Sequence, residues 1–153
     1  MCSSDLIAGR ADLVAACARH PLARALRPGA HVLLALQQVA LSFLDRSAAT
    51  TIPFWQMVAA PLDELTRRAT SVVQAAGVGE VVASDAIPGA GSAPGTTIPS
   101  VAVRVPGDLL GALREQHPPV VARTRDGATL LDLRSVHPSD DAHLADAIRT
   151  CAS

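Results

Sequence analysis

The sequence predicts an α+β protein whose larger, carboxy-terminal part is a small antiparallel sheet with helices packed on one face. Two observations lead to this fold class. From about residue 53 onward, hydrophobic periodicity and turn residues predict the order α-β-β-α-β-β-α, which suits such a sheet. The dipeptide Asp126-Gly127 separates two β-type segments and is a strong hairpin signal, because both residues tolerate a positive φ.

The composition supports a packed core and excludes some kinds of function. The chain has 153 residues, 49% of them hydrophobic, which is too apolar for a disordered segment. Its formal charge of −1 argues against a general polyanion binder. All 13 basic residues are arginine. With no lysine there is no side-chain amine for a Schiff base, so the chain by itself cannot hold an aldehyde cofactor covalently.

The cysteines and the most apolar stretch predict a protein of the cytoplasm. Cys2, Cys17 and Cys151 are odd in number and form no C-x-x-C pair, so neither a disulfide framework nor a zinc site is expected. Residues 32–44 are the most apolar, but two glutamines interrupt them and they are too short to cross a bilayer. The first residues lack the pattern of a signal peptide.

The first third of the chain is predicted to be mainly helical. Residues 6–9 read as the end of a buried strand, and Ala11–Arg19 as a short helix that stops at His20-Pro21. Residues 22–27 form a compact basic segment. A longer helix is expected over Ala30–Leu44, and its apolar residues cover most of the circumference. Such a helix is normally buried between other layers.

The remaining elements follow from periodicity and from breakers. Helical spacing predicts one helical region over residues 53–76, ended by glycine. A short strand over residues 80–84, a Gly/Pro/Ser/Thr loop over 85–99 and an alternating, half-buried strand over 100–105 come next.

The last part is predicted as a helix, a hairpin and a final helix. The first helix covers residues 108–116, and the hairpin strands cover 120–125 and 129–134. Asp132 and Arg134 alternate with leucines there, which indicates a solvated strand face. Ser139 is expected to cap the last helix.

Four collinear segments, between about residues 6 and 136, resemble the bacterial selenocysteine synthases, the L-seryl-tRNA(Sec) selenium transferases. The first is IAGRADL (7–13) followed by RHPLARALR (19–27), similar to the segment after the cofactor lysine in that family. The second is Ile52-Pro53 with Met57. The third is the loop GAGSAPG (89–95) with IPS (98–100), and the fourth is the hairpin within residues 119–136.

The resemblance implies an α/β protein with the aspartate-aminotransferase-like fold of enzymes that depend on pyridoxal 5′-phosphate (PLP). Residues 1–29 would be the tail of the PLP-binding large domain, residues 30–52 a linker helix, and residues 53–153 an α+β small domain. The chain departs from the family at Gly29-Ala30, where members carry Asp-Lys, and at Ala90, where they carry glycine. The cofactor lysine would lie before Met1.

The resemblance also implies an activity. The family converts seryl-tRNA(Sec) to selenocysteinyl-tRNA(Sec), with selenophosphate as the selenium donor and PLP as the cofactor, and its members form homo-oligomers. This chain would be the carboxy-terminal part of such an enzyme. Because it lacks the lysine, it is expected to be inactive alone, and no catalytic residue is assigned to it.

Arg24 and Arg27 are the first candidate binding residues. They are three residues apart, so a helical segment would place both on one face, where guanidinium forks can bind phosphate-like oxygens. The resemblance assigns them to selenophosphate, while spacing alone favours a solvated or salt-bridging pair.

A second candidate is an active-site loop formed by Gly91, Ser92, Pro94 and Gly95. The serine offers a hydroxyl, and the glycines allow close backbone approach. A plain surface connection explains the same residues equally well. No histidine or cysteine spacing indicates a metal site.

Two other functions remain open from the sequence. One is a related PLP-dependent lyase of the same fold that acts on a small substrate. The other is a stand-alone α+β interaction module. A tRNA-binding domain upstream would distinguish the transferase from the lyase, and a folded, cofactor-free monomer would favour the module.

Overall fold

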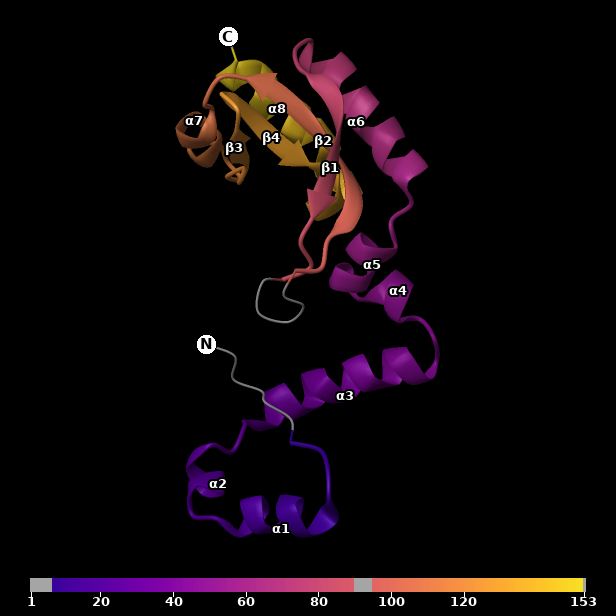
Figure 1. The fold of residues 1–153 in the computed structure, drawn as a ribbon, viewed down its shortest axis with the longest axis vertical. Helices are drawn as coiled ribbons and strands as arrows, with labels where there is room; N and C mark the ends of the chain where they lie inside the picture. The colour runs from indigo at the N-terminus through magenta and orange to yellow at the C-terminus, as the bar shows by residue number, and fades with distance from the viewer. Residues whose placement is uncertain (1–6, 90–94, 153) are drawn as a thin grey trace. The chain divides into compact units, whose positions relative to one another are not determined.

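The computed structural model describes residues 7–89 and 95–152 of the chain (Figure 1). The chain divides into two compact units, Met1–Ile52 and Pro53–Ser153. The described part of the first unit is helical, and the second unit combines helices with a four-stranded sheet.

The first unit consists of four helices: α1 (Ala11–Arg19), α2 (Leu22–Ala25), α3 (Ala30–Leu44) and α4 (Ala48–Thr51). The predicted bounds of α1 and α3 are confirmed. The strand end predicted at residues 6–9 is wrong for the described residues 7–9, which form a coil and a bend with no strand partner. Ile7 is 65% exposed, so its apolar side chain does not mark a buried strand here.

Helix α3 forms where periodicity places it, but the prediction that it is buried is wrong for this chain. None of its residues is buried. Its exposed large apolar side chains are Leu33, Leu34, Leu36, Val39, Leu41, Phe43 and Leu44. A helix that is apolar all round needs packed layers on several sides. The described residues of the first unit do not supply these layers.

The sheet of the second unit contains β1 (Glu80–Ala86), β2 (Ile98–Pro106), β3 (Arg123–Arg125) and β4 (Ala128–Asp132). The strand order is β1-β2-β4-β3, and every neighbouring pair is antiparallel. This confirms the predicted antiparallel sheet. The hairpin turn is also confirmed, since Asp126 and Gly127 have φ values of 50° and 70°.

The helices α6 (Leu62–Ala76) and α8 (Asp141–Cys151) pack against the same face of the sheet, as Figure 1 shows. The remaining helical elements of this unit are α5 (Pro53–Ala59), α7 (Leu110–Arg114) and the 3₁₀ turns Leu133–Ser135 and Pro138–Asp140. The centre of the core is formed by fully or nearly fully buried side chains from helices and strands: Leu65, Ala69, Val72, Val101, Val103, Val105, Leu131, Leu144 and Ile148. The predicted layer arrangement is therefore confirmed.

Several predicted bounds in the second unit are wrong for local physical reasons. The helical region expected over residues 53–76 is two helices, because Pro61 is extended at φ −70° and ψ 150° and begins α6 as its N-cap. Strand β3 starts at Arg123 and not at residue 120. Strand β4 ends at Asp132 and not at residue 134, because a 3₁₀ turn begins at Leu133.

The predicted cap at Ser139 is also wrong. Helix α8 begins at Asp141, and Ser139 lies in the preceding 3₁₀ turn. There the backbone N–H of Ser139 donates to Nδ1 of His137 at 3.3 Å.

Within the residues that the structure describes, no helix combines the length and the hydropathy that a membrane span requires.

Candidate anion-binding site

A hollow of about 400 Å³ lies in the first unit, where α1 ends and α2 begins. Its lining residues are Ala18, Arg19, His20, Pro21, Ala23, Arg24 and Arg27. Both arginines predicted from the sequence therefore line the same hollow. Two further polar residues that the sequence prediction did not assign to the site, Arg19 and His20, lie beside them.

The backbone of this segment explains how the side chains come together. Helix α1 stops at His20, whose N–H still donates to the carbonyl of Cys17 at 3.1 Å. Pro21 starts the next turn, and the N–H of Arg24 donates to its carbonyl at 3.2 Å. The N–H of Arg27 then donates to the carbonyl of Arg24 at 3.4 Å. Residues three apart along such turns project from the same side.

Among the described residues, no carboxylate lines the hollow and none neutralises its guanidinium groups. Within residues 7–89 and 95–152, the side chains of Arg19, Arg24 and Arg27 have no hydrogen-bond or ion-pair partner. Exposed arginines with free forks attract anions, and oxyanions in particular can be bound in a bidentate way.

The two described carboxylates of the first unit are engaged elsewhere. Asp12 pairs with Arg10 at 2.6 Å, and hydrogen bonds from the Arg10 side chain lower the pKa of Asp12. Asp45 accepts the N–H of Ser47 at 2.9 Å, and hydrogen bonding by Ser47 lowers its pKa. Both groups therefore stay ionised and remain with their own partners.

The formal charge is also divided between the units. Met1–Ile52 contains five arginines and three aspartates, which gives +2. Pro53–Ser153 contains eight arginines and eleven acidic residues, which gives −3. The overall charge of −1 therefore conceals a basic first unit, and the basic hollow belongs to it.

The loop prediction falls largely outside the described residues. Gly91, Ser92 and Pro94 all lie there. Gly95 is described: it is exposed, with a φ of 75°, and belongs to the second unit. The structure thus brings Arg24 and Arg27 into one hollow and places Gly95 in the other unit.

The base of this loop is fixed by a polar cluster that sequence reasoning missed. Ser84 and Ser100, on paired strands, donate their hydroxyls to Asp132 at 3.0 and 2.5 Å. Arg123 donates to the Ser84 hydroxyl at 2.6 Å, and Arg134 to the carbonyl of Pro99 at 2.6 Å. The sequence signal that could have indicated this cluster is that two serines and an aspartate each lie within a predicted strand.

The prediction of a solvated face at Asp132 and Arg134 is wrong. Arg134 is only 6% exposed. Its guanidinium also donates hydrogen bonds to the carbonyls of Met57, Val58 and Ala60. Alternation predicts which side a residue faces, but these carbonyls come from a distant part of the chain.

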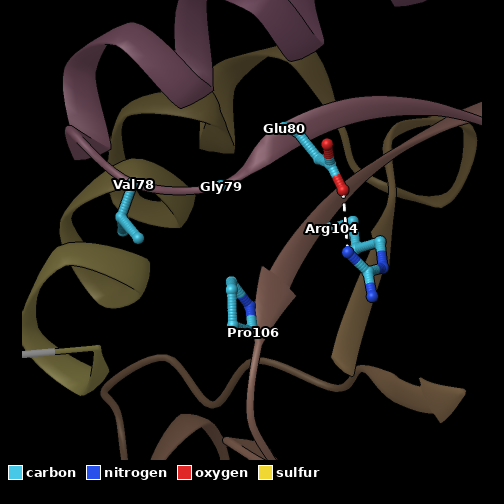
Figure 2. Close-up of a pocket in the computed structure, with 5 residues that line it drawn as sticks. All are labelled: Val78, Gly79, Glu80, Arg104 and Pro106. Atoms are coloured by element: carbon cyan, nitrogen blue, oxygen red, sulfur yellow. Dashed lines mark hydrogen bonds and ion pairs between the residues drawn. The ribbon is translucent and has the colours of Figure 1, made fainter. Parts of the chain in front are cut away.

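A second hollow, of about 290 Å³, lies at the edge of the sheet (Figure 2). Val78, Gly79, Glu80, Arg104 and Pro106 line it. Glu80 and Arg104 form an ion pair of 2.8 Å, which is marked by the dashed line in Figure 2. Arg104 is the one cation among its described lining residues and is already paired, so this hollow attracts an anion less strongly than the hollow of the first unit.

Metal binding finds no support in the described part of the chain. No group of three or more His, Cys, Asp or Glu side chains converges there in a way that could hold an ion. The two described cysteines, Cys17 and Cys151, are free thiols.

The described structure is that of an α+β protein with a basic hollow in its first unit. The family model described as "SelA: L-seryl-tRNA selenium transferase" matches residues 2–137. The chain belongs to this family.

Individual relatives agree with the family match. The L-seryl-tRNA(Sec) selenium transferase of Moorella thermoacetica is 36% identical over 159 residues, covering 95% of this chain and 34% of the relative. The proteins of the same name from Hyphomonas neptunium and Carboxydothermus hydrogenoformans are 31% and 27% identical, over 96% and 87% of this chain. This chain spans about a third of the length of the curated relatives it matches.

Proposed function

We propose that this chain supplies the carboxy-terminal part of an L-seryl-tRNA(Sec) selenium transferase, which converts seryl-tRNA(Sec) to selenocysteinyl-tRNA(Sec) with selenophosphate. The observation that carries the proposal is a hollow in a member of this family, whose described lining has three arginines without a described partner and no carboxylate. Selenophosphate is a phosphate-like anion, and such a hollow suits its charge and its oxygens.

In this proposal Arg24 and Arg27 bind the selenium donor. Their guanidinium groups are exposed, line one hollow and are free to form paired N–H···O bonds with the donor. The positive charge would also hold the phosphate oxygens while water attacks phosphorus and the P–Se bond breaks, so that selenium leaves as selenide and inorganic phosphate forms beside both cations. Neither residue is proposed to move a proton.

PLP belongs to the proposed whole enzyme, but the side chains present here do not fit its covalent attachment. All 13 basic residues are arginine, so no amine is available to hold the cofactor. No step that uses PLP is therefore assigned to this chain. Its proposed part is to bind and orient the selenium donor. In this proposal the cofactor lysine, the seryl-tRNA(Sec) contacts and the homo-oligomer involve further sequence of the enzyme. The whole enzyme is expected in the cytoplasm.

The loop that contains Gly91, Ser92, Pro94 and Gly95 is proposed as an active-site loop of the whole enzyme. Its support is the polar cluster at its base: Asp132, held by two serine hydroxyls, ties the two strands together where the loop begins and ends. A fixed base limits the positions that a loop can reach.

A chimera tests the proposed function. This chain would replace the matching segment of the Moorella thermoacetica relative, and formation of selenocysteinyl-tRNA(Sec) from radiolabelled selenophosphate would be measured. We expect activity in the chimera and a loss of at least about tenfold in kcat/KM for selenophosphate with Arg24→Met or Arg27→Met. Arg114→Met is the matched control, since Arg114 is also unpaired among the described residues but lies in α7. A folded chimera that forms no product contradicts the proposal.

A further inference from the structure

Arg19 and His20 lie in the hollow but have no part in the proposed function so far. Arg19 is the last residue of α1, and His20 follows it directly. Both line the same hollow as Arg24 and Arg27. The hollow thus presents three guanidinium groups and one imidazole.

The distribution of unpaired arginines in the described structure points to this place. Eight of the 13 arginines have a hydrogen-bond or ion-pair partner there. The five without one are Arg19, Arg24, Arg27, Arg46 and Arg114. Three of these five line one hollow. Like charges that line one hollow repel one another, so a bound anion of high charge relieves an unfavourable interaction there.

The hydrogen bond at Nδ1 of His20 determines which ring nitrogen carries the proton. Its Nδ1 accepts the backbone N–H of Leu22 at 3.2 Å. A nitrogen that accepts a hydrogen bond carries no proton, so the ring proton must be on Nε2. The Nε2–H is thus available to donate to an oxyanion.

We propose that Arg19 and His20 are further binding residues for a phosphate-like dianion, and that they form a four-residue site with Arg24 and Arg27. The inference rests on the proposed function, because it assigns additional contacts to the same anion site. Three cations around one hollow favour a doubly charged anion over a singly charged one, since each attraction scales with the anion's charge. Arg19 therefore contributes to selectivity for the dianionic form.

A purely structural role is the alternative for both residues. Arg19 lies in the last turn of α1, where a positive charge is favourable near the helix carboxyl end. The Nδ1 of His20 already holds the start of α2 through Leu22. Structural roles predict lower helix stability after substitution but no change in anion affinity.

The experiment measures binding of inorganic phosphate to the full ¹⁵N-labelled chain by NMR, at low salt and at a pH where phosphate is mainly dianionic. Saturable shifts are expected for the backbone amides of residues 17–27. Arg19→Gln is expected to weaken phosphate binding roughly three- to tenfold, the loss of one exposed charge-assisted contact. Arg19→Lys keeps the charge at the end of α1 and is expected to retain more affinity than Arg19→Gln.

Two further variants complete the design. His20→Asn keeps an oxygen that can accept the N–H of Leu22 but has no donor at the Nε2 position, so it is expected to weaken phosphate binding about threefold or more. Arg114→Gln is the control and is expected to bind phosphate like the parent chain. The amide spectrum of each variant shows directly whether it remains folded.

The outcomes separate this inference from the proposed function. If Arg19→Gln and His20→Asn bind phosphate like the parent chain while Arg24→Gln and Arg27→Gln do not, the four-residue site is refuted and the proposed role of the other pair stands. If none of the four changes affinity, both fail. The assignment to a small anion is overturned if a short RNA hairpin shifts the same amides at a far lower concentration than inorganic phosphate does.

Discussion

Removal of the Arg134 side chain tests the packing that joins the start of the second unit to its sheet. The guanidinium of Arg134 donates to the carbonyls of Met57, Val58, Ala60 and Pro99 at 2.6–3.1 Å. Three of these acceptors lie at the α5–α6 junction, and the fourth lies at the start of β2. Arg134→Met keeps most of the aliphatic volume but leaves all four carbonyls without this donor.

The expected cost follows from the number of hydrogen bonds lost. Nη1 has two hydrogens for the carbonyls of Met57, Val58 and Ala60, and Nη2 donates to Pro99, so three N–H groups are involved. At about 1 kcal/mol for each, the free energy of unfolding should fall by about 3 kcal/mol. The buried Nε atom has no partner in the described structure, which offsets part of the stabilisation in the parent chain. A unit of this size is stable by roughly 5–15 kcal/mol in total. The change should therefore lower Tm by roughly 12–24 °C.

Urea unfolding followed by circular dichroism measures this free energy, and a thermal scan measures Tm. Arg125→Met is the matched control, because its side chain is 78% exposed and its only described ion pair is with the adjacent Asp126. We expect the control to change stability by less than about 0.5 kcal/mol. If Arg134→Met were as stable as this control, the reasoning from buried carbonyl acceptors would be refuted.

Three further predictions concern other features. Asp132→Asn should lower the free energy of unfolding by about 1–2 kcal/mol in urea titrations, because an amide oxygen accepts the hydroxyl of Ser100 less strongly than a carboxylate does. Asp12, whose pKa is lowered by Arg10, should titrate below its ordinary value of 3.8 in an NMR pH titration; its stabilising contribution is then complete above 3.8 and lost only in more acidic solution. Arg10→Ala should return that pKa to its ordinary value, and an unchanged pKa would contradict the assigned cause. Gly79→Ala should destabilise the chain by about 1–3 kcal/mol in urea titrations, because φ is 98° and the added Cβ would lie 3.0 Å from a carbonyl oxygen of β2; unchanged stability would show that the edge of the sheet moves freely.

Local sequence signals were sufficient for much of the fold. The hydrophobic run and the flanking Gly29 and Asp45 define α3 without help from the rest of the chain. The turn Asp126-Gly127 determines the hairpin through backbone conformation alone. Pro61 also carried a local signal, the break between α5 and α6, which the prediction of one continuous helical region overlooked.

Properties that depend on distant residues were not predictable in this way. Arg134 binds a carbonyl 77 residues away at Met57, and nothing in its own strand pattern indicates this partner. The burial of α3 depends on whether other layers are present, and periodicity does not report their presence. For the hollow, the three-residue spacing of Arg24 and Arg27 predicted that the two side chains lie together. Arg19 joins them only because the chain turns at Pro21.

The exposed apolar surface of α3 has a practical consequence for handling the chain. Seven large apolar side chains of one helix are in contact with water. A surface of this kind promotes self-association as concentration rises and attracts chaperones that bind unfolded chains. Recombinant yield should therefore improve with mild detergent, a solubilising fusion partner or low expression temperature, and light scattering of purified samples should increase with concentration.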